Sequence, residues 1–301
     1  SHLSERLLSD GYEVVGIDCF TDYYAREIKE SNVARLREEP RFTLLEMDLS
    51  SAPVEGLLEG IDEVYHLAAQ AGVRGSFGDS FELYVRNNVQ ATQRLLEQAA
   101  RTPVEAFVYA SSSSVYGNAA VSPTPEDAPR QPISPYGMTK VATEEIAAVY
   151  HRNHGVPAVG LRYFTAYGPR QRPDMAFNRF IRSALAGKPI AILGDGMQVR
   201  DFTYVDDVVE GTRAASARGK AGSVYNIGGA EEVSANQVIA LLQDIIGKEA
   251  IVQHGPARLG EQSRALADMR LAREQLGFVP ATSLRQGLEA QVAWQRALAR
   301  D

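Results

Sequence analysis

The sequence contains the stretch Ala106-Phe107-Val108-Tyr109-Ala110-Ser111-Ser112-Ser113-Ser114, an apolar run that ends in four serines. The apolar run predicts a buried strand. Tyr136 and Lys140 follow on a segment that reads as one helix, where a spacing of four residues puts both side chains on the same face. We therefore expect the serines, the phenol and the ammonium to meet at one site.

These three kinds of side chain suit one chemistry. A lysine ammonium held near a tyrosine favours the phenolate and lowers the pKa of Tyr136, which makes the phenol a usable base near neutral pH. A serine hydroxyl across the pocket would hold the substrate oxygen. The set suits removal of a proton from an alcohol while hydride leaves the same carbon. The tyrosine–lysine spacing alone is common by chance, so this interpretation depends on the nucleotide-binding pattern around it.

The first half of the chain alternates short apolar runs with helical patterns, which is typical of a parallel sheet flanked by helices. The runs predicted as strands are 13–17, 42–47, 63–67, 106–110 and 158–163. Apolar residues recurring from Phe81 to Ala99 predict one long helix packed on the sheet. The expected fold is a Rossmann-type, doubly wound parallel α/β sheet that forms an NAD-binding domain over residues 1–168.

The second half has a looser pattern. It predicts helices over 177–186, 234–246 and 283–298, and a short strand over 190–193. We expect residues 169–301 to form a smaller C-terminal α/β domain that binds the substrate and interleaves with the first domain.

The chain opens on a helical pattern formed by Leu3, Leu7 and Leu8, and an apolar strand ending at Asp18 follows. In a dinucleotide-binding fold, a strand and a glycine-rich turn precede this helix and hold the pyrophosphate at its N-terminus. We therefore expect roughly one strand and one glycine loop ahead of Ser1.

The composition excludes several classes of protein. A net charge of −7 argues against a nucleic-acid surface. The single cysteine, Cys19, excludes an internal disulfide and a cysteine metal cluster, and suits a reducing compartment. No apolar stretch is long enough to span a bilayer, no signal peptide opens the chain, and no His/Cys/Asp cluster has metal-ligand spacing. We expect a cytoplasmic protein that binds no metal, membrane or nucleic acid.

Several strand ends carry candidate cofactor-binding residues. Asp18 either holds the ribose hydroxyls of an adenosine, which favours NAD over NADP, or is a solvated carboxylate. Asp48, at the end of the next strand, is placed near the adenine. Leu67, Ala68 and Ala69 provide small residues where backbone must approach a ligand, unless they only allow tight packing. His66 is expected to be a packed core histidine rather than a base.

Seven segments match, in order, the motifs of a known family: 1–3, 66–69, 111–117, 136–140, 161–169, 200–205 and 225–229. The chain resembles the extended short-chain dehydrogenases/reductases of the nucleotide-sugar epimerase and dehydratase family. The resemblance implies a tightly bound NAD, with Tyr136 as the base, Lys140 on the nicotinamide ribose, Ser112 as the catalytic serine and Tyr163 near the cofactor. The implied reaction is epimerisation at C4 of a UDP-sugar through a 4-keto intermediate.

Two parts of the sequence, the pair 113–114 and position 165, narrow the choice of substrate within this resemblance. Dehydratases of the family carry an Asp-Glu pair where this chain has Ser113 and Ser114, and decarboxylases usually carry Glu at position 114. Thr165 stands where UDP-galactose 4-epimerases and decarboxylases usually have Asn. A threonine followed by the segment 168–176 resembles the sequence of the UDP-glucuronate 4-epimerases. Ser113, Ser114 and Thr165 would hold a C6 carboxylate by neutral hydrogen bonds, with Arg172 sensing it. Thr165 could instead bond only its own backbone.

Other positions are expected to bind the UDP diphosphate or uridine. The guanidinium group of arginine can donate two parallel hydrogen bonds to phosphate oxygens. The residues assigned to the diphosphate, the uridine or the loop covering the ligands are Arg200, Arg258, Asn178, Arg179 and Arg74. Asp206 and Asp207 are expected to cap a helix rather than bind a metal.

The sequence thus predicts a UDP-glucuronate 4-epimerase. The alternatives are a UDP-glucose/UDP-galactose 4-epimerase, and a non-catalytic NAD or nucleotide-sugar binding protein, against which the intact Ser112, Tyr136 and Lys140 argue. By resemblance, we expect a homodimer formed through the tyrosine helix and the long helix before Ala106.

Overall fold

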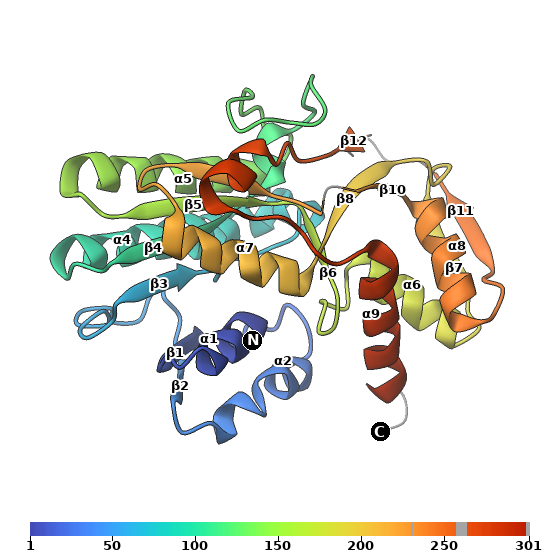
Figure 1. The fold of residues 1–301 in the computed structure, drawn as a ribbon, viewed down its shortest axis with the longest axis horizontal. Coiled ribbons are helices and arrows are strands. Elements are labelled where there is room, and N and C mark those ends of the chain that lie inside the picture. The colour runs from blue at the N-terminus through green and yellow to red at the C-terminus, as the bar shows by residue number, and fades with distance from the viewer. Residues whose placement is uncertain (230, 257–263, 299–301) are drawn as a thin grey trace.

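The computed structural model describes residues 1–229, 231–256 and 264–298. A four-stranded parallel sheet lies at its centre, and Figure 1 shows helices on both sides of that sheet. In spatial order, the strands are β3 (Glu63–His66), β4 (Ala106–Ser112), β5 (Ala158–Tyr163) and β9 (Val224–Ile227). A separate parallel pair is formed by β1 (Val14–Asp18) and β2 (Phe42–Glu46). The five strands expected in the first half are therefore present, with ends that differ by at most two residues from those predicted.

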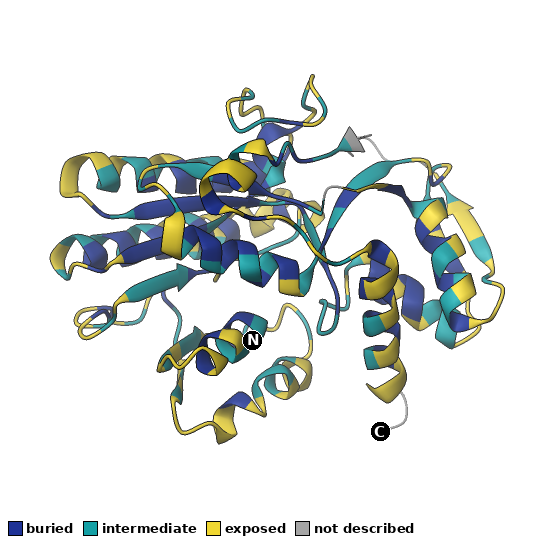
Figure 2. Ribbon diagram, in the orientation of Figure 1, coloured by how far each residue is buried: buried dark blue, intermediate teal, exposed yellow. Residues whose placement is uncertain are grey.

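The side chains of β4 show how both faces of the sheet are buried. Successive strand residues point to opposite faces. Phe107 and Tyr109 lie in one apolar cluster with residues of α4 (Ala91–Arg101) and α5 (Pro135–His154). Val108 lies in another cluster with residues of α7 (Val205–Arg218). Figure 2 shows the inner strands β4 and β5 as almost entirely buried, whereas β3 at the edge of the sheet is mostly intermediate. The expected doubly wound α/β fold is confirmed.

The start of the chain packs on α7. Leu3 and Leu7 of α1 (His2–Ser9) form a small cluster with Val209. After β1 come α2 (Arg26–Val33) and the short 3₁₀ helix η1 (Leu36–Glu38). The strand and glycine loop expected ahead of Ser1 remain a prediction.

The segment predicted as one long helix is divided into three. It comprises α3 (Phe81–Tyr84), a π-helical stretch η4 (Val85–Gln90) and α4. Within η4, the buried Asn88 side chain accepts from the Gln70 backbone N at 2.7 Å and donates to the Thr139 hydroxyl at 2.9 Å. A wider turn that places a polar side chain between neighbouring elements is a common use of π-helical geometry. The spacing of apolar residues in the sequence does not reveal where α-helical turns are replaced by π-helical turns.

The second half forms its own apolar cluster. Its helices are α6 (Ala176–Leu185), α8 (Ala235–Ile246) and α9 (Leu284–Leu298), close to the predicted spans. Strand β7 (Ile190–Leu193) matches its prediction and pairs with β11 (Val252–Gly255). Strand β8 (Val199–Tyr204) pairs with β6 (Thr165–Tyr167), β10 (Glu232–Ser234) and β12 (Arg264–Ala265). The remaining short helices are η2 (Arg74–Ser76), η3 (Gly78–Ser80), η5 (Ser113–Tyr116) and η6 (Ala272–Leu276).

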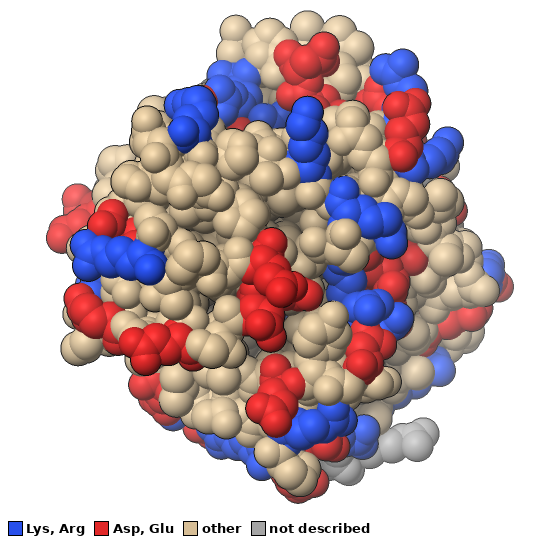
Figure 3. All heavy atoms as spheres, turned by 60° about the vertical axis from the view of Figure 1, so that its left-hand side comes forward, with Lys and Arg blue, Asp and Glu red and all other residues tan. Residues whose placement is uncertain are grey.

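Two surface properties bear on possible partners. Among the described residues, no helix combines the length and apolar character that crossing a membrane would require. On the face drawn in Figure 3, basic and acidic side chains are interspersed.

Candidate active site

The serine run forms a tight turn at the carboxyl end of β4. Ser112 is the N-cap residue of η5, and its Oγ accepts a hydrogen bond from the Ser114 backbone N at 3.2 Å. Helix α5 begins in the same neighbourhood, where Ser134 caps it by accepting from the Gly137 backbone N at 3.1 Å and Pro135 occupies its first turn. A serine cap followed by proline is a strong helix start. The turn and the first turn of α5 are thus fixed locally.

Gly137 allows α5 to approach this turn closely. A Cβ atom at position 137 would lie 2.6 Å from the Ser114 carbonyl oxygen, closer than such atoms can approach. The position next to Tyr136 therefore has to be glycine for Tyr136 to reach the serines at this spacing.

We predict that Gly137→Ala displaces the start of α5 and lowers kcat about 100-fold, because a shift of about 1 Å in a catalytic group has an effect of that size. Steady-state kinetics would measure it. Met138→Ala, at the next and half-exposed position, is the matched control and should leave kcat within about twofold. Equal kinetics of both variants would contradict the close-approach argument.

Ser112, Tyr136 and Lys140 meet as the sequence predicts. The Ser112 side chain favours the charged form of the Tyr136 phenol. Lys140 is buried, and its Nζ donates to the Ala110 carbonyl oxygen at 2.8 Å and lies 6.0 Å from the centroid of the Tyr136 ring. Tyr84 of α3 meets the Tyr136 ring edge-on at 6.3 Å. The phenol is therefore held between a hydroxyl, an ammonium and an aromatic wall.

The electrostatics of the pair differ from the prediction. Burial raises the pKa of Tyr136, and the Ser112 side chain and the positive charge of Arg172 only partly offset this increase. The expectation that Lys140 lowers this pKa is wrong for the polypeptide itself, because the ammonium is directed to the Ala110 carbonyl. Burial also lowers the pKa of Lys140, to about 8, against the opposing charge of Glu144.

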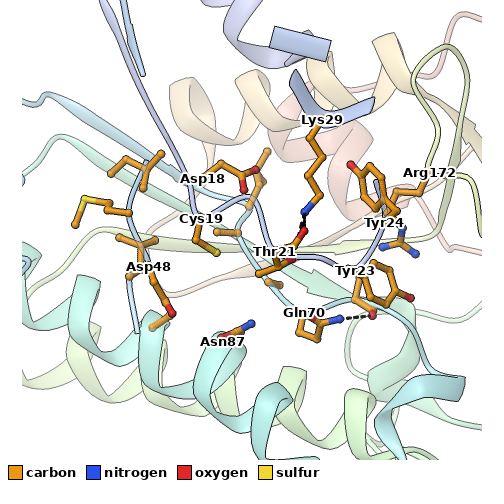
Figure 4. A pocket seen from close by; sticks show the side chains of 18 residues that line it. Asp18, Cys19, Thr21, Tyr23, Tyr24, Lys29, Asp48, Gln70, Asn87 and Arg172 are labelled. Atoms are coloured by element: carbon orange, nitrogen blue, oxygen red, sulfur yellow. Dashed lines mark hydrogen bonds between the residues drawn. The ribbon is translucent and has the colours of Figure 1, made fainter. Parts of the chain in front are cut away.

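A pocket of about 230 Å³ lies at the carboxyl ends of β1, β2 and β3. It collects the predicted cofactor-binding residues Asp18, Asp48, Leu67, Ala68 and Ala69. Figure 4 shows Asp18 and Asp48 toward one end and Tyr23, Tyr24 and Arg172 toward the other. The carboxyl ends of parallel strands are where dinucleotides bind in such sheets.

The two acids of the pocket are held by their own loops. Asp18 ends β1, is exposed, and accepts from the Phe20 backbone N at 2.7 Å. Asp48 lies two residues beyond β2 and accepts from the backbone N and the hydroxyl of Ser50 at 2.8 and 2.6 Å. Burial alone would raise the pKa of Asp48, but these hydrogen bonds lower it. An exposed carboxylate at the first strand end and accessible small residues after β3 fit the adenosine half of NAD.

Other predicted residues lie farther from this pocket or have other partners. The Tyr163 hydroxyl bonds the Thr212 hydroxyl of α7 at 2.7 Å. Asn178 is buried and donates to the Gln171 carbonyl at 2.8 Å. Arg172 lines the pocket, pairs with Asp174 at 3.0 Å and lies 5.4 Å from the centroid of the Tyr23 ring.

The remaining predicted substrate residues are placed on separate elements. Ser113 and Ser114 lie in η5, Thr165 begins β6, Arg179 is exposed on α6, Arg74 is exposed in η2, and Arg200 is half-buried in β8. Arg258 lies outside the described residues.

Two sequence-based expectations concern residues outside the pocket. His66 is buried, its ring Nε2 lies 2.9 Å from the Thr92 hydroxyl, and burial lowers its pKa to about 3, which confirms a packed core histidine. The capping role given to Asp206 and Asp207 is wrong. Tyr204 is the N-cap residue of α7, and the Asp207 carboxylate instead accepts from the backbone N atoms of Ala281 and Thr282.

The prediction missed part of the pocket. Cys19, Thr21, Tyr23, Tyr24, Lys29, Gln70 and Asn87 also line it. Lys29 Nζ donates to the Thr21 carbonyl at 2.5 Å and lies 4.8 Å from the centroid of the Tyr24 ring. The signal for most of these residues was their position just after a strand end, where loops of a parallel sheet meet a ligand.

The covered parallel sheet, the pocket at its strand ends and the adjacent serine, tyrosine and lysine define a dinucleotide-binding enzyme of the short-chain dehydrogenase/reductase class. The profile of the NAD dependent epimerase/dehydratase family matches residues 1–228. The chain belongs to this family, as its motifs predict.

The relatives cover nearly the whole chain. An uncharacterised UDP-glucose epimerase of Bacillus subtilis, YtcB, is 44% identical over 300 residues, which span 99% of this chain and 95% of that protein. UDP-glucuronate 4-epimerase of Thermodesulfobacterium geofontis is 36% identical over 299 residues, 98% and 92% of the two chains. The crystal structure of UDP-glucuronic acid 4-epimerase from Bacillus cereus, in complex with UDP-glucuronic acid and NAD, has a TM-score of 0.95 at 43% identity and covers 99% and 95%.

Proposed function

We propose that this chain is an NAD-dependent UDP-glucuronate 4-epimerase. The observation that carries the proposal is the meeting of Ser112, Tyr136 and Lys140 beside a strand-end pocket, with hydroxyl side chains at positions 113 and 114. The Bacillus cereus relative, crystallised with UDP-glucuronic acid and NAD, supports the same substrate and cofactor.

The strand-end pocket would hold NAD. Asp18 would bind the adenosine ribose, Asp48 the adenine, and residues 67–69 would let the backbone approach the cofactor. Lys140 would bind the nicotinamide ribose, and the ring of Tyr163 would lie near the same end. When bound, NAD supplies a hydride acceptor for C4 of the sugar and a positive charge beside the phenol.

The residues of the chain move the proton. Ser112 orients the C4 hydroxyl toward Tyr136, whose oxygen accepts the hydroxyl proton while C4 becomes a ketone. The 4-keto sugar turns over in the pocket. Tyr136 then returns the proton after hydride reaches the opposite face of C4. The positive charge of Arg172 stabilises the phenolate, which exists before the first transfer and again after the second.

The choice at C6 would depend on three hydroxyls. Ser113, Ser114 and Thr165 are each half-buried and offer neutral donors to a carboxylate. Neutral donors hold the carboxylate without an acid or base that promotes elimination or loss of CO₂. Arg172 would approach the carboxylate from the pocket side.

The second half of the chain would bind UDP. We assign Arg200 and Arg258 to the diphosphate, Asn178 and Arg179 to the diphosphate or uridine, and Arg74 to the covering loop. In this proposal residues 1–168 form the NAD-binding domain, and residues 169–301 form the interleaved nucleotide-sugar-binding domain. We also propose that the protein is a cytoplasmic homodimer whose interface is formed by α4 and α5.

The test is NMR of the sugar protons with full-length protein and each of UDP-glucuronate and UDP-glucose. We expect UDP-glucuronate to give UDP-galacturonate at least about tenfold faster than UDP-glucose reacts, since the hydroxyls face a carboxylate. A pentose product would mean that the chain decarboxylates. If neither substrate is converted, the result would favour a non-catalytic binding protein.

A second candidate is a UDP-glucose/UDP-galactose 4-epimerase. The name of the Bacillus subtilis relative favours it, at 44% identity. Faster conversion of UDP-glucose in the same assay would support this candidate and would remove the C6 roles of Ser113, Ser114 and Thr165.

A further inference from the structure

A buried charged cluster lies one helical turn beyond Lys140. Glu144 follows Lys140 by four residues, so both side chains are on the same face of α5. Its carboxylate accepts from Arg162 Nε and Nη2 at 2.8 Å each, from Ser111 Oγ at 2.5 Å and from Arg130 Nη1 at 3.2 Å. The proton chemistry proposed above does not use this cluster.

The cluster joins α5 to the two strands beneath it. Ser111 belongs to β4 and Arg162 to β5, and both side chains are buried together with Glu144. Lys140 Nζ donates to the carbonyl of Ala110, the residue before Ser111. Two neighbouring residues of β4 therefore hold α5: Ala110 binds its lysine and Ser111 binds its glutamate.

We propose that Glu144 is a positioning residue for Lys140: its buried carboxylate fixes α5 on β4 and β5 and supplies the negative charge that faces the ammonium. The role in turnover rests on the proposed function, because it assumes that Lys140 assists Tyr136. The effect on the charge state of Lys140 does not depend on any reaction.

The charged and titratable groups around the pair come from several elements. Besides Glu144 they are Tyr136 of α5, Tyr84 of α3, His66 of β3, Tyr109 of β4, Arg162 of β5 and Arg130 of the preceding loop. Burial raises the pKa of these tyrosines and lowers that of His66, so all of them are neutral near pH 7. Both arginines are positive. Within this described set, Glu144 is the negative group.

This arrangement predicts the direction of each change. Burial lowers the pKa of Lys140 to about 8, and the charge of Glu144 opposes that decrease. Without the carboxylate, the two arginines would face Lys140 uncompensated, and the ammonium would lose its proton at lower pH. A unit charge roughly 6 Å away, at an effective dielectric constant of about 20, changes a pKa by about 1–2 units.

The test is a ¹³C NMR titration of protein labelled at the lysine ε carbons. The five lysines are Lys29, Lys140, Lys188, Lys220 and Lys248. The Lys140 signal is assigned by its loss in Lys140→Met. We expect its midpoint near 8 in the unchanged protein and about 1–2 pH units lower in Glu144→Gln. In a plot of kcat/KM against pH, the alkaline decrease should move to lower pH by the same amount, because activity is lost where Lys140 loses its proton.

Two variants separate charge from structure. Glu145→Gln is the matched control, since Glu145 also pairs with Arg130 but its side chain is 53% exposed, and the Lys140 midpoint should stay within about 0.3 units. Glu144→Asp keeps the charge and should hold the midpoint within about 0.5 units. A merely structural Glu144 would not separate the Gln and Asp variants in this way.

An unmoved midpoint in folded Glu144→Gln would overturn the proposal. If that variant does not fold, Arg130→Gln decides, because Arg130 is partly exposed and its loss leaves Glu144 paired with Arg162. That variant should raise the midpoint by several tenths of a unit, and no change would again overturn the proposal. A protein that turns over neither UDP-sugar would refute the proposed function, yet the Lys140 midpoint would still be measurable.

Discussion

Tyr136→Phe is expected to lower turnover of the UDP-sugar about 10²–10⁴-fold, the range over which a positioned general acid–base group acts. The substitution removes one oxygen, the atom that would accept the C4 proton. The ring would remain in place, because it packs against Tyr84 and follows the fixed start of α5. The affinity for UDP-glucuronate should change less than about threefold, since the diphosphate and uridine residues are untouched.

The measurement combines NMR turnover with calorimetric binding of UDP-glucuronate. Tyr150→Phe is the matched control: it lies on the same helix, but its hydroxyl donates to Glu97 Oε2 at 2.6 Å, away from the serine turn. This control should keep turnover within about twofold. Turnover of Tyr136→Phe close to that of Tyr150→Phe would refute the assignment of the base. Loss of binding in Tyr136→Phe would mean that the ring itself shapes the substrate site.

The parts of the fold that the sequence predicts well are those set by local patterns. The runs that form β4 and β5 are continuous and apolar because both faces of these strands are covered. The meeting of Tyr136, Lys140 and Ser112 also follows from local rules, namely helical spacing and the position of a strand end. By contrast, the sequence does not predict the short strands β6, β10 and β12. Each has only two or three residues, and only their pairing with β8 makes them strands.

The parts that the sequence does not predict depend on long-range partners. Arg162 sits in an otherwise apolar strand, and its partner Glu144 lies 18 residues earlier on another element. Neither the spacing nor the composition connects them, although a lone arginine in a buried strand demands some partner. The raised pKa of Tyr136 has the same origin, since it results from burial, to which Tyr84 on the separate helix α3 contributes.

Arg162→Met is expected to give the largest loss of stability in this chain. Arg162 is buried and makes four hydrogen bonds: two to Glu144, one to the Tyr116 hydroxyl and one to the Glu126 carbonyl. Removing one partner of a buried ion pair leaves a desolvated charge, which costs about 3–5 kcal/mol. For a chain of this length we expect the thermal midpoint to fall by roughly 6–15 °C.

Calorimetric or circular-dichroism melting would measure this loss against Arg101→Met. Arg101 forms an ion pair with Glu97 at 2.7 Å, but the two side chains are 64% and 37% exposed, so its loss should cost about 0.5 kcal/mol or less. Adding Glu144→Gln to Arg162→Met should recover part of the stability, because the double variant no longer strands a buried charge. Equal melting points for Arg162→Met and Arg101→Met would show that the buried pair contributes no more than a surface one. In that case Glu144 could not be the anchor that holds α5 and Lys140 in place.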